Sequence, residues 1–169
     1  MTNKLLELPI EDFGKLLSVI GKEKDYEFRL DFYTDLISIG KGLGVDEIEE
    51  LPIEKHKELS KELMEEIVDI NQYNKLPNEI RIGSTLYYTS AKKENFSFKT
   101  KEFKMIQAIL GKPEYVVDFA AIIWREKDGE LTQEAIDTRK AIFSNGLKVK
   151  HIISYINLFT NHLISDDNS

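Results

Sequence analysis

The chain has 169 residues, no cysteine, 41% hydrophobic residues and 31% charged residues, which is typical of a single folded domain. A chain of this length buries roughly 70% of its unfolded surface, so it needs no disulfide or metal to fold. The absence of cysteine excludes disulfides and thiolate metal sites and fits a reducing, cytoplasmic compartment. The first residues lack the apolar run of a signal peptide, and the longest apolar stretch, 119–124, is too short to cross a membrane.

The net charge of −7 is concentrated in one segment. Residues 46–69 hold ten acidic residues against three lysines, so this segment alone carries −7 and the remainder is neutral overall. An acidic surface disfavours general binding to duplex DNA, because neutralised phosphates supply most of that affinity. The charge therefore argues against a general duplex-DNA binder.

Residues 9–44 predict two secondary-structure elements followed by a glycine-rich loop. A helix is expected over 9–20, with Pro9 near its start and Gly21 at its end. Residues 25–37 fit a helix by their apolar spacing and a strand by their alternation, and both alternatives stay open. The glycine-rich sequence GKGLG at 40–44 lacks the Lys-Ser/Thr ending of a phosphate-binding loop. We interpret it as a loop between helices.

Residues 45–72 predict a charged helical segment, re-initiated at Pro52. Its expected packing stripe consists of Ile53, Leu59, Leu63, Ile67 and Ile70. A ridge of carboxylates lies on another side, at Glu54, Glu58 and Glu62. The ridge fits a docking surface for a basic partner. We favour a solvated face, neutralised by Lys57, Lys61 and helix-spaced ion pairs.

The second half predicts a small β-element followed by helices. Apolar alternation around Gly83–Ser84 and at Phe96–Phe98 indicates two or three antiparallel strands at about residues 80–99. Helices are then expected at 101–110, 114–125, 132–145 and 148–164. The expected fold is α+β and mainly α, with five to six helices around the β-element. One domain would span 1–169, divided into a helical part at 1–76, a hairpin with helices at 77–164, and a disordered tail at 165–169.

Catalytic chemistry finds little support in the residues. The three histidines, His56, His151 and His162, have no metal-ligand spacing. No nucleophile elbow is present. Asp118 falls on a polar seam of its predicted helix, so we expect it to face solvent or an ion pair. The sequence predicts no enzyme, no metal and no cofactor.

Residues 92–104 combine lysines with neighbouring aromatic side chains, a pattern that can hold single-stranded nucleic acid. The same pattern arises where lysines protect the edge of a small sheet, and we favour that interpretation. A nucleic-acid-binding regulator remains the second alternative.

Large apolar side chains of two helices are better suited to binding protein. We expect a protein partner, or a second copy of the chain, to contact the exposed parts of the helices over 114–124 and 148–164. The candidate partner-binding residues are Tyr115, Phe119, Ile123, Trp124, Ile152, Tyr155 and Phe159.

Three segments carry a resemblance to a known class of proteins: Ile82–Tyr87, Phe98–Ile106 and Phe119–Arg125. Their order over residues 80–164 resembles small morphogenesis proteins of tailed bacteriophages, including tail assembly chaperones. The resemblance implies a protein without cofactor or active site that grips a helical partner such as the tape-measure protein in the host cytoplasm. The alternative that it implies is a structural subunit of the virion, in a ring of the neck, tail or capsid.

Overall fold

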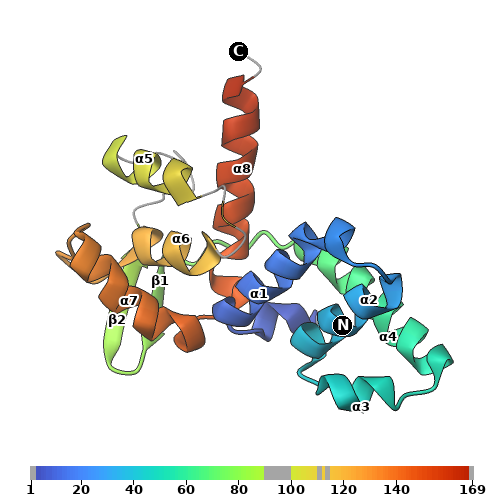
Figure 1. The fold of residues 1–169 in the computed structure, drawn as a ribbon. Helices are drawn as coiled ribbons and strands as arrows, with labels where there is room; N and C mark the ends of the chain where they lie inside the picture. Colours follow the sequence, from blue (N-terminus) through green and yellow to red (C-terminus); the bar gives the residue numbers. More distant parts are fainter. Residues whose placement is uncertain (1–2, 90–99, 110–111, 113–114, 168–169) are drawn as a thin grey trace.

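The computed structural model describes residues 3–89, 100–109, 112 and 115–167. These residues form eight α-helices and one three-stranded antiparallel sheet (Figure 1). The predicted α+β, mainly helical class is confirmed. The helices outnumber the expected five to six partly because the segment after the glycine-rich loop divides into two helices.

The amino-terminal part is entirely helical. Its elements are a 3₁₀ helix η1 (Lys4–Glu7), α1 (Ile10–Gly21), η2 (Glu23–Asp25), α2 (Arg29–Lys41), α3 (Val45–Glu49) and α4 (Ile53–Ile70). The open alternative over 25–37 is resolved as a helix. Gly42 ends α2 with a φ of 69°, a left-handed conformation that glycine adopts without strain. Pro52 separates α3 from α4, as expected from its missing N–H.

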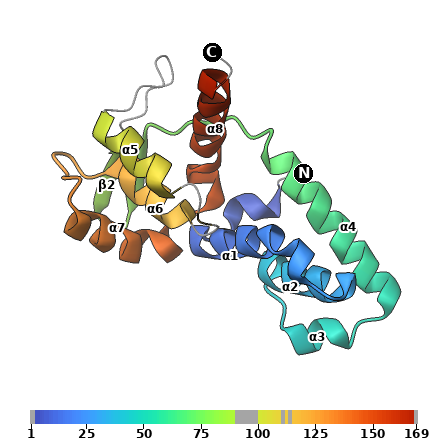
Figure 2. The ribbon, with the colours of Figure 1, turned by 45° about the horizontal axis from the view of Figure 1, so that its top comes forward.

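The amino-terminal helices form a layer with α4 at its margin. Helix α1 packs against α2, and α2 packs against α4. At Gly40 the two helices come close, since an added Cβ would lie 2.6 Å from Leu63 Cδ1. Figure 2 shows α4 running along the outer edge of the molecule, away from the carboxy-terminal helices.

The sheet begins with the predicted hairpin. Strands β1 (Glu79–Ile82) and β2 (Thr85–Thr89) pair around Gly83–Ser84, where Gly83 has a φ of 59°. The third strand, β3 (Trp124–Arg125), pairs with the far end of β2. The helix expected over 114–125 therefore ends two residues early, because Trp124 and Arg125 hydrogen-bond to a neighbouring strand. The strand expected at Phe96–Phe98 lies outside the described residues.

Four helices complete the fold: α5 (Thr100–Ile109), α6 (Tyr115–Ile123), α7 (Gln133–Gly146) and α8 (Ile153–Asp167), with η3 (Val149–His151) before α8. Helix α6 packs against α1, α5 and α7, and all of its residues from Phe119 to Ile123 are buried. Thr132 caps α7 by accepting a hydrogen bond from Ala135 N at 3.2 Å. Helix α8 includes residues 165–167, which the sequence assigned to a disordered tail.

The amino-terminal segment is joined to the start of the last helical region. Val149 N donates to Leu8 O at 3.0 Å, and Lys150 Nζ lies 2.6 Å from Glu7 Oε1. We call this contact between residues 7–10 and 147–150 the terminal clasp. It holds η1 against η3.

Candidate functional site

Most of the predicted partner-binding residues are in the hydrophobic core. Six of the seven have at most 2% of their surface exposed: Phe119, Ile123, Trp124, Ile152, Tyr155 and Phe159. Trp124 packs edge-on against Tyr155, with ring centroids 5.8 Å apart. Tyr115 is only partly buried and packs against this core. The prediction that these side chains form an exposed apolar surface is wrong for the six buried ones, because they pack in the hydrophobic core.

Two buried charged groups near this core hold elements together. Glu102 on α5 is fully buried, and Arg125 Nη2 donates to its Oε1 at 2.9 Å. Arg139 on α7 is also buried and donates to Ala121 O and Glu130 O, each at 2.8 Å. Burial lowers the pKa of Arg139. Both side chains are engaged in joining α5 and α7 to their neighbours, which is a structural role.

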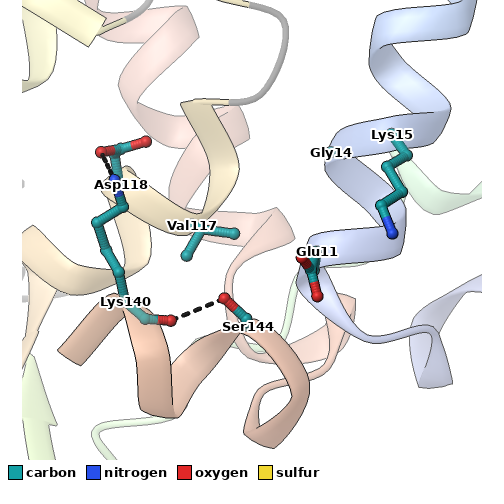
Figure 3. A pocket seen from close by; sticks show the side chains of 7 residues that line it. All are labelled: Glu11, Gly14, Lys15, Val117, Asp118, Lys140 and Ser144. Carbon is teal, nitrogen blue, oxygen red and sulfur yellow. Dashed lines mark hydrogen bonds and ion pairs between the residues drawn. The ribbon is translucent and has the colours of Figure 1, made fainter. Parts of the chain in front are cut away.

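A polar cleft of about 240 Å³ lies between α1, α6 and α7. Figure 3 shows Asp118 and Lys140 joined on one side of the cleft, with Glu11 and Lys15 of α1 on the other side. Asp118 Oδ1 lies 2.8 Å from Lys140 Nζ, so its predicted place in an ion pair is confirmed. Lys15 is itself paired, 3.6 Å from Asp12 on the same helix.

The cleft has few groups free for chemistry. Its hydroxyl, on Ser144, donates to Lys140 O at 2.8 Å, and its lining contains no histidine to act as a base. In the part of the chain that the structure describes, no cluster of three or more histidine, aspartate or glutamate side chains is placed to hold a metal. The arrangement is that of a charged helix junction.

An apolar groove lies at the opposite end of the molecule, between α2 and α4. A hollow of about 370 Å³ is lined by Leu30 and Tyr33 of α2 and by Met64 of α4. It continues into a second hollow of about 450 Å³ beside Val68. Lys61 and Met64 line both hollows, so the two adjoin along α4; the first lies between α2 and α4, and the second is lined by α4 alone. We call the two together the α2–α4 groove.

The groove exposes apolar surface to solvent. Leu30 is 49% exposed, Met64 37% and Val68 59%. The polar side chains that line the first hollow, His56 and Ser60, make hydrogen bonds within the protein. His56 Nε2 lies 3.0 Å from Thr34 Oγ1, and the Thr34 hydroxyl donates to Leu30 O, so the ring N–H of His56 donates to the threonine. The buried His56 of α4 thus forms a hydrogen bond to Thr34 of α2 and joins the two helices.

The rim of the groove on α4 carries charges in a fixed order. Lys57 and Lys61 come first, and Glu65 and Asp69 follow, all exposed. Within the described residues these four side chains form no salt bridge.

Two of the three carboxylates of the predicted ridge, those of Glu58 and Glu62, pair with lysines other than those expected. Lys41 of α2 lies 3.2 Å from Glu62 and 3.0 Å from Glu66, and Lys55 lies 3.0 Å from Glu58. Of the favoured interpretation, one helix-spaced ion pair, Lys55–Glu58, is present, whereas the expected roles of Lys57 and Lys61 are not, because Lys41 pairs from another helix. The pairing leaves Lys57 and Lys61 available on the groove side.

Sequence reasoning missed the groove because it assigned one apolar stripe to α4. Helix α4 has a second stripe beside the buried one, formed by Ile53, Met64 and Val68 at positions i, i+11 and i+15. Ile53, placed in the packing stripe by its spacing, is 48% exposed. A helical wheel extended over all of α4 contains the signal that was missed.

No protein-family model, no curated protein and no solved structure matches the chain. Among the described helices, none combines the length and the apolar character needed to cross a bilayer.

Proposed function

We propose that this chain is a non-enzymatic protein-binding protein, and that the α2–α4 groove holds the apolar face of an amphipathic helix. The observation that carries the proposal is the continuous groove with its three exposed apolar side chains, Leu30, Met64 and Val68. Soluble proteins expose single apolar residues freely, but a grouped apolar patch with a charged rim is typical of an interface. In the polar cleft between α1, α6 and α7, Asp118 and Lys140 pair with each other and the Ser144 hydroxyl bonds to Lys140 O.

A helix suits this groove better than an extended peptide. The groove follows α4 from Lys57 to Asp69, which is about 18 Å at the rise of an α-helix. Its walls are helices, so no free strand edge is available along it to pair with an extended chain. A third helix laid beside α2 and α4 would cover the apolar stripe by ordinary helix packing.

The resemblance of residues 80–164 to tailed-phage morphogenesis proteins supplies a setting for this proposal. In that setting the chain grips a helical virion protein, such as a tape measure, during tail assembly in the host cytoplasm. The alternative is a structural virion subunit of the neck, tail or capsid ring. The exposed charges of α4, basic at Lys57 and Lys61 and acidic at Glu65 and Asp69, support this alternative, because such an order can pair with a second copy of itself.

The proposal is tested with a fluorescent model peptide of about 18 residues, designed as an amphipathic helix with a leucine face. The groove variant Met64→Ser/Val68→Ser should bind the peptide at least about tenfold more weakly than the native chain, a loss of about 1.4 kcal/mol or more. Fluorescence anisotropy measures the affinity.

The matched control is Ile142→Ser, because Ile142 is 40% exposed on α7 and lies outside the groove. The control should bind as the native chain does, and circular dichroism should report the same helix content in all three proteins. Equal peptide binding by the groove variant and the native chain would contradict the proposal.

A further inference from the structure

The charges on the rim of the groove are arranged so that α4 complements itself. Lys57, Lys61, Glu65 and Asp69 follow one another at intervals of four residues, about 6 Å along the helix axis. The basic pair lies in the amino-terminal half of α4 and the acidic pair in the carboxy-terminal half. A partner helix that matches this order must carry acidic residues beside the lysines and basic residues beside the acids.

Helix α4 itself has this order when it runs in the opposite direction. A two-fold axis at the level of Leu63 brings Lys61 of one copy opposite Glu65 of the other, and Lys57 opposite Asp69. Each contact occurs twice, which is the defining property of a symmetric dimer interface. These side chains are exposed and form no salt bridge within the described residues, so they are free to pair across the axis.

The same symmetry brings the apolar groups together. Met64 is next to the axis and meets Met64 of the other copy. Val68, the most exposed apolar residue of α4, falls at the level of residue 58 in the other copy, beside the hollow that Leu30 and Tyr33 line. A side chain that is exposed in one copy is thus placed to fill a hollow in the next. Helix α4 is accessible for this contact because it lies at the outer edge of the molecule (Figure 2).

We propose that the helix held in the α2–α4 groove is α4 of a second copy, packed antiparallel about a two-fold axis near Leu63. This inference rests on the proposed function, since it identifies the helix that the groove takes. A stable complex buries at least about 1,200 Å² of surface in total, and one pair of packed helices buries less. The dimer should therefore be weak, with a dissociation constant of roughly micromolar order. Salt should weaken it further, because the ion pairs are exposed.

The test uses the full chain and two complementary charge reversals, Lys57→Glu/Lys61→Glu and Glu65→Lys/Asp69→Lys. Sedimentation velocity over a hundredfold concentration range should show the native chain moving from its monomer mass of 19.6 kDa towards twice that mass. Each reversal alone places like charges opposite each other and should raise the dissociation constant at least about tenfold. An equimolar mixture of the two variants should regain dimer, because every pair across the axis is again of opposite charge.

The control reversal is Lys101→Glu/Lys104→Glu on α5, where both lysines are exposed and distant in sequence from the groove. This variant changes the net charge as much as the lysine reversal in α4 does and should dimerise like the native chain. Circular dichroism checks that each variant is folded.

Two results would overturn the inference: a native chain that stays monomeric across the range, or charge-reversed variants that dimerise as the native chain does. Peptide binding separates these results from a failure of the proposed function. A monomeric chain whose groove still binds the model peptide loses only the second copy as its partner. A monomeric chain that binds no peptide loses both proposals.

Discussion

The amino-terminal helices and the carboxy-terminal part use their apolar residues differently. Six of the eight large hydrophobic residues that are exposed among the described residues lie in the helical part: Phe28, Leu30, Val45, Ile53, Met64 and Val68. In the carboxy-terminal part, α6 is covered on three sides by α1, α5 and α7, whereas α4 has α2 and η1 as its main neighbours. A helix becomes core when enough elements cover it, so apolar content alone does not separate core from binding surface.

The largest effect is expected at Trp124. Replacing it with alanine removes a fully buried ring and should lower the free energy of unfolding by about 3–5 kcal/mol. Urea denaturation followed by circular dichroism measures this loss. Trp124→Phe should cost much less, because the indole N–H has no hydrogen-bond partner in the described structure and its loss leaves no group unsatisfied. An alanine variant as stable as the native chain would mean that Trp124 is not part of a packed core.

A smaller effect is expected at the ion pair between α5 and β3. Arg125→Met removes an ion-pair partner of the fully buried Glu102 and should lower the free energy of unfolding by about 3 kcal/mol. The double variant Glu102→Gln/Arg125→Met should be more stable than Arg125→Met, because it no longer buries that charge. A double-mutant cycle measured in urea gives the coupling between the two residues. Additive effects would show that the pair does not hold α5 in place.

The smallest effect is a dependence on pH at His151, the residue that follows the terminal clasp. Burial, together with the charge of Lys150, lowers the pKa of His151 below its usual 6.5, and Lys148 N donates to His151 Nδ1 at 3.0 Å. The unfolded chain therefore binds this proton more readily than the folded chain, and stability should fall as the pH drops below about 6.5.

His151→Gln should lose less stability than the native chain between pH 7.5 and 5.0, as measured by thermal unfolding at each pH. This window lies above the pKa of Glu7, which Lys150 lowers from 4.5, so the nearby carboxylate stays charged throughout. Identical pH profiles for the two proteins would rule out a contribution from His151.

The helices of this fold could be predicted from the sequence because their ends carry local signals. Pro9, Pro52 and Gly146 lie at or next to helix ends, and Gly83 lies in the hairpin turn, as their backbone preferences predict. The third strand could not be predicted, since Trp124 continues the apolar run of α6 and its pairing with Thr89 depends on a distant hairpin.

The candidate site was misplaced for a related reason. The spacing of Phe119, Tyr155 and Phe159 identifies apolar faces, but only the tertiary arrangement decides which of those faces are covered. The charge order on α4 was readable in the sequence. The sequence could not show which of these charges stay unpaired, because Glu62 and Glu66 pair with Lys41 of α2, a contact that only the tertiary structure reveals.

The terminal clasp has a consequence for the way this chain is made. On the ribosome, residues 7–10 emerge well before their hydrogen-bonding partners at 147–150, because Glu7 and Lys150 are 143 positions apart. The amino-terminal helices can pack on one another earlier, because their contacts are local. The contacts between α2 and α4 that line the groove can thus form before the terminal clasp, which needs residues 147–150.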